Sequence, residues 1–306
     1  MDRLCYGHDA YRWLRGGVSV NDHTLSDFRV AHQAALDDLL TQSIAALLQR
    51  GIVTMARVAQ DGTRVRGSAG AGSFRRGETL AECLRQARKQ VERVQKQADT
   101  PVNARADAAQ QRAAADRMAR VEEALAQLPA LEATKQRQKG QRPTEARVST
   151  TDPDARVMKM GDGSFRAAYN VQIKTAVGGA HIVGVSVTDR GSDYGLLGEA
   201  VGEVERRYGV TPVKLLADGG YFSKADIETL HGRGIELFCP LPRKGKTDPA
   251  LPKRGDGPGT IAWRQRMAGE RGQAIYRRRF ATERPHAHMR NHGLRRLLVR
   301  GIEKVK

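Results

Sequence analysis

A short apolar run that ends in a carboxylate constrains this chain more than any other stretch. Residues 213–222 read V-K-L-L-A-D-G-G-Y-F, so the run ends at Asp218 and two glycines follow it. Such a run predicts a strand buried on both faces, and the glycines predict its abrupt end. In open α/β sheets, ligands and metals gather at the carboxyl ends of strands, whereas Asp-Gly is also common in solvated turns. The rest of the chain has to decide between these two interpretations.

A second carboxylate follows another predicted strand. Apolar residues recur through 52–60, and this predicted strand ends at Asp61, which Gly62 and Thr63 follow. A helical region is predicted before it, within residues 1–50, and this region is expected to be incomplete. The glycine-rich stretch 67–73 has no G-x-x-x-x-G-K-[ST] pattern, so no nucleotide-binding loop is predicted there.

Two long helical segments are predicted to follow the first strand. Apolar residues step by four and three in each of them, which is the spacing of a coiled-coil seam and predicts an antiparallel helical hairpin. The basic residues on this hairpin form either a solvated face or a DNA contact. The apolar positions are Leu80, Leu84, Ala87, Val91, Val94, Ala98, Met118, Val121, Leu125 and Leu128.

The second half of the chain alternates between strand and helix patterns. Apolar and polar residues alternate in two stretches, 169–175 and 181–188, which predicts an antiparallel hairpin. After it the pattern predicts a helix over 192–208, the Asp218 strand, a helix over 223–232 and a strand over 236–240. This order is that of a ribonuclease H-like α/β fold: a mixed sheet flanked by helices, with the helical hairpin inserted after the first strand. The predicted parts are an N-terminal helical region (1–50), the first strand and loop of a catalytic domain (51–75), the insertion (76–148) and the rest of that domain with a basic C-terminal region (149–306).

The charge of the chain favours nucleic acid as its partner. The formal net charge is +18 and the sequence pI is about 10.3. Residues 263–306 hold thirteen Lys and Arg against three acids, so the charge is concentrated, as on a docking surface. No apolar run is long enough to span a membrane, and no signal-peptide core begins the chain, so a cytoplasmic protein is predicted. The three cysteines are far apart, which argues against a disulfide framework and a zinc knuckle.

Four residues near the C-terminus complete a recognisable pattern. Tyr276, Arg279, Glu283 and Arg290 stand at offsets of zero, three, seven and fourteen, so a continuous helix would place them on one face. The spacing resembles the Y-(2)-R-(3)-E-(6)-K motif of the DDE transposases of bacterial insertion sequences, with arginine in place of the final lysine. The blocks A-D-G-G-Y-F and V-A-Q-D-G-T-R-V-R, the stretch T-D-P-D-A-R-V-M-K and the block 169–172 are also similar to that family.

The resemblance implies an enzyme with a defined site. Asp61, Asp218 and Glu283 would be the catalytic acids and would hold two Mg²⁺ (or Mn²⁺) ions, which hard oxygen ligands suit. Tyr276, Arg279 and Arg290 would position DNA phosphates. The implied reaction is metal-dependent strand cleavage and transfer at the ends of an insertion sequence. The partner would be double-stranded DNA, both at the ends of the element and at the target site. The chain would form a homo-oligomer on this DNA, would be associated with the bacterial nucleoid and would not bind a membrane.

Several alternatives stay open at the level of sequence. Asp152, Asp154 and Asp162 compete with Asp61 for the role of first acid because they precede the 169–175 strand more closely; Asp61 is preferred because it ends a predicted strand and carries the D-G-T of the family. Pro285 predicts a kink or restart in the helix that carries Glu283.

The overall function also has alternatives. The chain could be a truncated, non-catalytic DNA-binding remnant of a transposase, or a metal-dependent nuclease of the same fold. His286, His288 and His292 are interpreted as phosphate-facing or surface residues rather than zinc ligands, because no cysteine or acid pair accompanies them.

Overall fold

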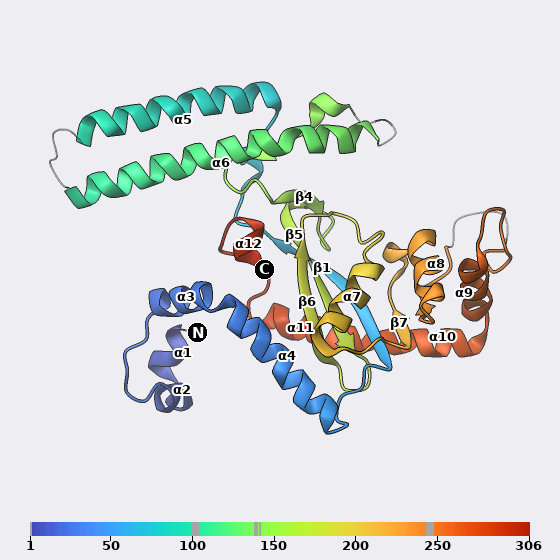
Figure 1. The fold of residues 1–306 in the computed structure, drawn as a ribbon. Helices are drawn as coiled ribbons and strands as arrows, with labels where there is room; N and C mark the ends of the chain where they lie inside the picture. The colour runs from blue at the N-terminus through green and yellow to red at the C-terminus, as the bar shows by residue number, and fades with distance from the viewer. Residues whose placement is uncertain (1, 99–103, 138–139, 141, 243–247) are drawn as a thin grey trace.

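The protein is organised around a curled mixed sheet. The computed structural model describes residues 2–98, 104–137, 140, 142–242 and 248–306. The main sheet has the order β4-β5-β1-β7-β8, with β6 also pairing with β5 (Figure 1). Its strands are β1 (Arg57–Arg66), β4 (Arg156–Lys159), β5 (Phe165–Ala176), β6 (His181–Thr188), β7 (Lys214–Leu216) and β8 (Glu236–Phe238). A two-stranded sheet pairs β2 (Phe74–Arg75) with β3 (Val148–Ser149). The α/β class predicted from the sequence is confirmed.

The central strand β1 runs differently from the prediction. It does not end at Asp61; it continues to Arg66 because β5 pairs with it antiparallel along nine residues, from Val58↔Ala176 to Arg66↔Ala168. Asp61 and Gly62 were interpreted as the end of a strand, but the backbones of both residues pair with β5. Tertiary pairing has overridden the local turn signal.

The parallel part of the sheet places the segments that contain Asp61 and Asp218 side by side. β1 pairs with β7 through Ala59↔Leu216, and β7 pairs with β8 through Leu216↔Phe238. Asp61 and Asp218 both lie two residues beyond the last of the β1–β7 pairs. The parallel register therefore places the two carboxylates next to each other at the end of β7.

Helices cover both faces of the sheet. The larger core combines β1, β7 and β8 with α4 (Gln33–Gln49), α7 (Leu197–Tyr208), α8 (Lys224–Gly232) and α9 (Pro258–Ala268), and it contains the fully buried Trp263. On the other face, Val65, Val171 and Ile173 pack against Met289 and the residues that follow it. The predicted helix over 192–208 begins only at Leu197, and residues 189–196 form a loop beside the sheet.

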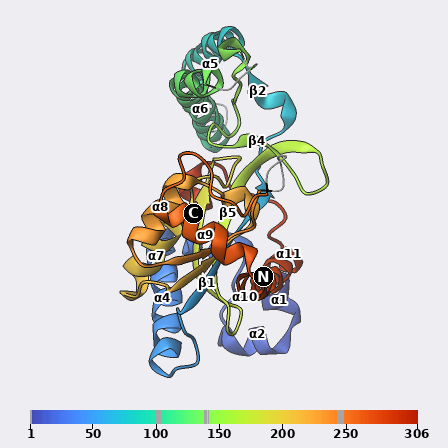
Figure 2. The same cartoon turned by 90° about the vertical axis from the view of Figure 1, so that its right-hand side faces the viewer.

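Two helical parts extend from this sheet. Helices α5 (Gly77–Ala98) and α6 (Ala104–Gln136) pack against each other as a long arm, in agreement with the predicted antiparallel hairpin (Figures 1 and 2). At the N-terminus, α1 (Asp2–Gly7), α2 (Asp9–Leu14) and α3 (Asp22–Ala31) precede α4. Asn21 caps α3 by accepting a hydrogen bond of 2.8 Å from the Thr24 backbone N–H. Within the described residues, no helix is both long and apolar enough for a membrane span.

The C-terminal motif is not on one continuous helix. Helix α10 (Glu270–Arg277) passes into a 3-10 segment, η4 (Arg278–Thr282), and α11 (Glu283–Asn291) then begins. Pro285 is the third residue of α11, where its missing N–H is tolerated. A 3-10 turn advances 120° per residue instead of 100°, so five such residues rotate the next helix by about 100°. The continuous helix that would place Tyr276, Arg279, Glu283 and Arg290 on one face is therefore not formed, and the helix restarts close to Pro285 as the sequence indicated.

Candidate active site

Asp61 lies where the sheet meets the C-terminal helices. Because side chains alternate along β1, Asp61 and Thr63 point to the face that η4 and α11 cover, and Gly62 points to the opposite face. The Asp61 carboxylate accepts a hydrogen bond from the Arg279 guanidinium at 3.1 Å and one from the Thr282 hydroxyl at 3.3 Å. The carboxylate is one-fifth exposed. Asp61 is thus held from the C-terminal motif, 218 residues further along the chain.

Asp218 lies beside Asp61 at the end of β7. Its backbone precedes the short 3-10 turn η3 (Gly219–Tyr221), which the carboxylate caps by accepting a hydrogen bond of 2.8 Å from the Gly220 N–H. Burial raises the pKa of Asp218, and the charge of Asp61 raises it further, against the opposing effects of the Gly220 N–H and Arg279. The two carboxylates therefore repel each other at a half-buried location, and a bound cation would relieve that repulsion.

Glu283 does not join the two aspartates in this structure. It is the first residue of α11, its side chain is exposed, and no described residue forms a hydrogen bond or ion pair with it. Thr282, one residue earlier, occupies the position against Asp61 instead. Accordingly, no group of three His, Cys, Asp or Glu residues in the described ranges is placed to hold a metal ion. Two of the three predicted acids are brought together, and the third is not.

The three predicted phosphate-binding residues lie along the same edge of the site. The Arg279 guanidinium stands 6.0 Å from the centre of the Tyr276 ring, and Tyr276 packs against the larger core. Arg290 donates a hydrogen bond of 3.1 Å to the Thr63 hydroxyl, two residues beyond Asp61 on β1. Arg279 and Arg290 therefore border the face of the sheet that carries Asp61, and Tyr276 lies beside Arg279.

His286 is a neighbour of Asp61 that the sequence interpretation missed. It was interpreted as phosphate-facing or at the surface, but it is buried, and its Nε2 lies 3.8 Å from the Asp61 carboxylate without a hydrogen-bond partner. Burial lowers the pKa of His286 against the pull of Asp61. His288 and His292 stack on each other, with ring centroids 5.5 Å apart, on the exposed side of the helix end. Only the i, i+3 spacing from Glu283 to His286 hinted that His286 faces inward.

The competing acids have structural partners elsewhere. Asp152 accepts hydrogen bonds from the Tyr169 hydroxyl at 2.6 Å and the Gly301 N–H at 3.0 Å. Asp154 accepts from the Gln127 side chain and from the Ile302 N–H at 2.8 Å. These two acids attach the C-terminal helix α12 (Ile302–Val305) and the arm to the sheet.

Asp162, the third competitor, lies in the turn before β5. It accepts hydrogen bonds from the backbone and side chain of Ser164 and pairs with Arg166. These local bonds, Ser164 foremost, lower its pKa. No contact joins Asp162 to Asp218 among the described residues.

The comparison with protein families agrees with this geometry. A family model described as a transposase DDE domain matches residues 131–306, which is more than half of the chain. The chain belongs to the transposase DDE domain family. The matched range contains Asp218, Glu283 and the residues around them, whereas β1 with Asp61 lies before it. Among curated proteins and among solved structures, no match to this transposase-family chain was found.

Family membership indicates a transposase role and chemistry of the nuclease and transposition type. This agrees with the resemblance found in the sequence motifs. The reaction that this particular chain performs is a further step, and the contacts around Asp61 and Asp218 are the basis for it.

Proposed function

We propose that this protein is a DDE transposase that cleaves DNA strands at the ends of an insertion sequence and joins them to target DNA. The observation that carries the proposal is that Asp61, within β1, lies beside Asp218, just beyond the end of the parallel strand β7, with Arg279 of the C-terminal motif bonded to Asp61. Two half-buried carboxylates and a guanidinium form a site suited to phosphate chemistry.

The strand order supports a ribonuclease H-like catalytic domain. Taken in chain order, β1, β5 and β6 form an antiparallel meander, and β7 and β8 add to the other side of β1 in parallel. We assign residues 51–75 and 149–306 to this domain and residues 76–148 to a helical insertion after its first strand, with residues 1–50 as an N-terminal helical region. The division agrees with the arm of α5 and α6 leaving the sheet after β1 (Figure 2).

The residues present fit a divalent cation such as Mg²⁺ or Mn²⁺. Asp61 and Asp218 offer hard oxygen ligands, and burial and mutual repulsion raise the pKa of Asp218, a cost that a cation offsets. A cation pair held there would activate the attacking hydroxyl and stabilise the leaving oxygen. Glu283 would complete the ligand set after a rotation of α11 that also withdraws Thr282 from Asp61.

The remaining residues of the site would bind and orient DNA. The Arg279 guanidinium offers paired N–H donors that suit a phosphate, and the Tyr276 ring lies beside it. Arg290 lies at the same edge. The concentration of Lys and Arg over residues 263–306 would bind double-stranded DNA through its phosphates, with two or more copies of the chain acting on paired element ends.

One observation favours a second candidate, a DNA-binding remnant without catalysis. The outward position of Glu283 leaves the site with two acids. If α11 cannot rotate, the chain would bind DNA and not cut it. The two candidates differ in whether Glu283 contributes to activity.

The test uses four variants of the full chain. Asp61→Asn, Asp218→Asn and Glu283→Gln remove one proposed ligand each, and Asp154→Asn is the matched control because its carboxylate serves α12 and Gln127. Each protein is incubated with Mg²⁺ or Mn²⁺, labelled element ends and a target plasmid. We expect the parent and Asp154→Asn to form joined products and the other three variants to form none.

DNA affinity measured at several salt concentrations completes the test. All four variants should bind DNA as the parent does, with affinity that falls steeply with salt, because binding comes from Lys and Arg contacts to phosphate. Cleaved ends without joined products would indicate a nuclease. A parent that binds DNA but never cuts it would indicate the remnant, and full activity of Asp218→Asn would overturn the assignment of the site.

A further inference from the structure

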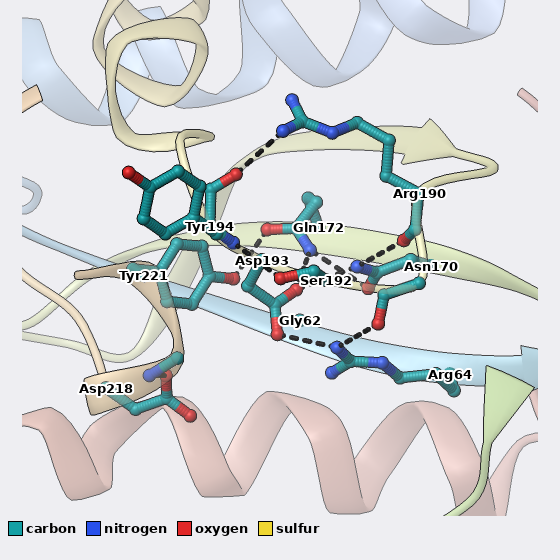
Figure 3. A network of polar contacts seen from close by, with 12 residues as sticks. Gly62, Arg64, Asn170, Gln172, Arg190, Ser192, Asp193, Tyr194, Asp218 and Tyr221 are labelled. Atoms are coloured by element: carbon teal, nitrogen blue, oxygen red, sulfur yellow. Dashed lines mark hydrogen bonds and ion pairs between the residues drawn. The ribbon is translucent and has the colours of Figure 1, made fainter. Parts of the chain in front are cut away.

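A buried polar network lies on the face of the sheet opposite to α11. Its centre is Asp193, which lies in the loop before α7 (Figure 3). The Asp193 side chain is 8% exposed. The Asp193 carboxylate accepts hydrogen bonds from the Asn170 amide at 2.7 Å, the Gln172 amide at 2.8 Å and the Arg64 guanidinium at 2.8 Å. These donors come from β1 and β5. The oxygens are therefore engaged by protein donors, and a charged group is stabilised in the interior.

The network touches the segment that follows the first proposed catalytic acid. A Cβ atom on Gly62 would lie 2.7 Å from an Asp193 oxygen and 2.5 Å from the Gln172 amide nitrogen. Only glycine allows the polar groups to approach the β1 backbone this closely. The residue after Asp61 therefore rests directly on Asp193 and its donors.

The network also reaches the segment that follows the second proposed catalytic acid. The Tyr221 hydroxyl, at the end of η3, donates a hydrogen bond of 2.5 Å to the Gln172 side-chain oxygen, and the Tyr221 ring is fully buried. A Cβ atom on Gly220 would lie 3.7 Å from the other Asp193 oxygen. The turn that begins at Asp218 thus rests on the same group as the strand of Asp61.

We propose that Asp193 is a positioning residue that sets the separation of Asp61 and Asp218. It acts through Gly62 on one side and through Gln172 and Tyr221 on the other. The proposal rests on the proposed function, in which the two acids hold a divalent cation. Residues that orient metal ligands affect metal affinity without touching the metal.

An acid suits this position better than an amide. An ionised carboxylate only accepts hydrogen bonds, and three donors converge on Asp193. An asparagine would turn one N–H toward the Arg64 guanidinium or toward an amide donor. The ion pair with Arg64 offsets part of the negative charge of Asp193, and the charge that remains contributes to the raised pKa of Asp218.

The test compares two network variants with a matched control. Asp193→Asn disturbs the centre of the network, and Tyr221→Phe removes a single hydroxyl while keeping the buried ring. Tyr208→Phe is the control, because the Tyr208 hydroxyl also donates to an internal acceptor, the Val183 carbonyl at 2.8 Å, at the opposite end of α7 from the Asp193 loop. Thermal unfolding establishes that each variant folds.

The first readout is Mn²⁺ affinity of the full chain without DNA, measured from the signal of free Mn²⁺ in electron paramagnetic resonance. We expect about a 10-fold to 100-fold loss of affinity in Asp193→Asn and about a 10-fold loss in Tyr221→Phe, with no change in Tyr208→Phe. The second readout is DNA cleavage as a function of Mn²⁺. The two network variants should need more Mn²⁺ and should recover rate at high Mn²⁺, and a general loss of folding would not show such recovery.

The outcomes separate this inference from the proposed function. If the parent binds Mn²⁺ and Asp218→Asn does not, the proposed metal site stands. Parental Mn²⁺ affinity in folded Asp193→Asn and Tyr221→Phe would then overturn the positioning role alone. A parent that binds no Mn²⁺ would overturn the metal site itself and the positioning role with it.

Discussion

Replacing Gly62 by alanine probes the packing between the sheet and the polar network. The added Cβ would lie 2.5 Å from the Gln172 nitrogen, 2.7 Å from an Asp193 oxygen and 3.0 Å from the Asn170 oxygen. Three such contacts cannot relax by moving one flexible side chain, because the amides and the carboxylate bond to one another. Overpacking of this kind costs about 1–3 kcal/mol.

The matched control is Gly67→Ala, just beyond the end of the same strand. A Cβ there would meet the Ala155 methyl group at 3.5 Å, an ordinary van der Waals contact. This variant should be unchanged or more stable by about 0.4–1 kcal/mol, because alanine restricts the unfolded chain.

The assay is unfolding of both variants by heat and by urea, followed by circular dichroism. We expect Gly62→Ala to unfold roughly 4 °C below the parent and below Gly67→Ala. The Mn²⁺ affinity of Gly62→Ala should fall as well, because Asp193 has to move. Equal stability of the two alanine variants would show that the β1 backbone does not lie against Asp193 and would refute the packing argument.

Three further predictions concern charged groups. Asp256→Asn should lose about 2 kcal/mol at pH 7, because Arg264 and Lys224 lose their charged partner. Burial raises the pKa of Asp256, but the hydrogen bonds from Lys224 and Arg264 outweigh it and hold the pKa below its ordinary value. Its contribution is therefore present above about pH 4 and is lost as the pH falls through the folded-state pKa, so denaturation curves of parent and variant should converge in acid; a gap that persists would contradict this. Asp218 has the opposite sign: burial and Asp61 raise its pKa, so the ionised form lowers stability above about pH 4. Asp218→Asn should accordingly raise the melting temperature of the metal-free protein at pH 7, and Mn²⁺ should raise it in the parent alone; an unchanged or lower melting temperature would contradict the repulsion. Glu203→Leu should cost about 3 kcal/mol because it leaves Lys174 buried without its acid, and adding Lys174→Met should recover most of that loss in urea unfolding. A double variant as unstable as the single one would show that Lys174 needs no charged partner.

The sequence by itself determined the class of fold and the members of most elements. Alternation along 169–175 and 181–188 predicts strands because the side chains of a sheet point to opposite faces, and those residues lie within β5 and β6. The four-three spacing of apolar residues predicts the two helices of the arm, because positions three and four apart lie on one face of a helix. The motif around Asp218 and the C-terminal spacing indicated the family that the comparison confirms.

Tertiary structure alone decided which residues meet. Asp61 was expected at a strand end but lies within β1, because pairing with β5 continues past the Asp-Gly step. Glu283 was expected on the face of Arg279, but a 3-10 segment between them changes the phase of the helix. Asp193 gave no signal of burial in the sequence, and the only signal for His286 was its spacing from Glu283, since both residues depend on contacts with strands more than 20 residues away. Local sequence patterns indicate which secondary structure a segment forms and which of its side chains share a face. The packing of segments that are distant in the sequence decides the strand register, the rotation of each helix and the partner of each buried charge.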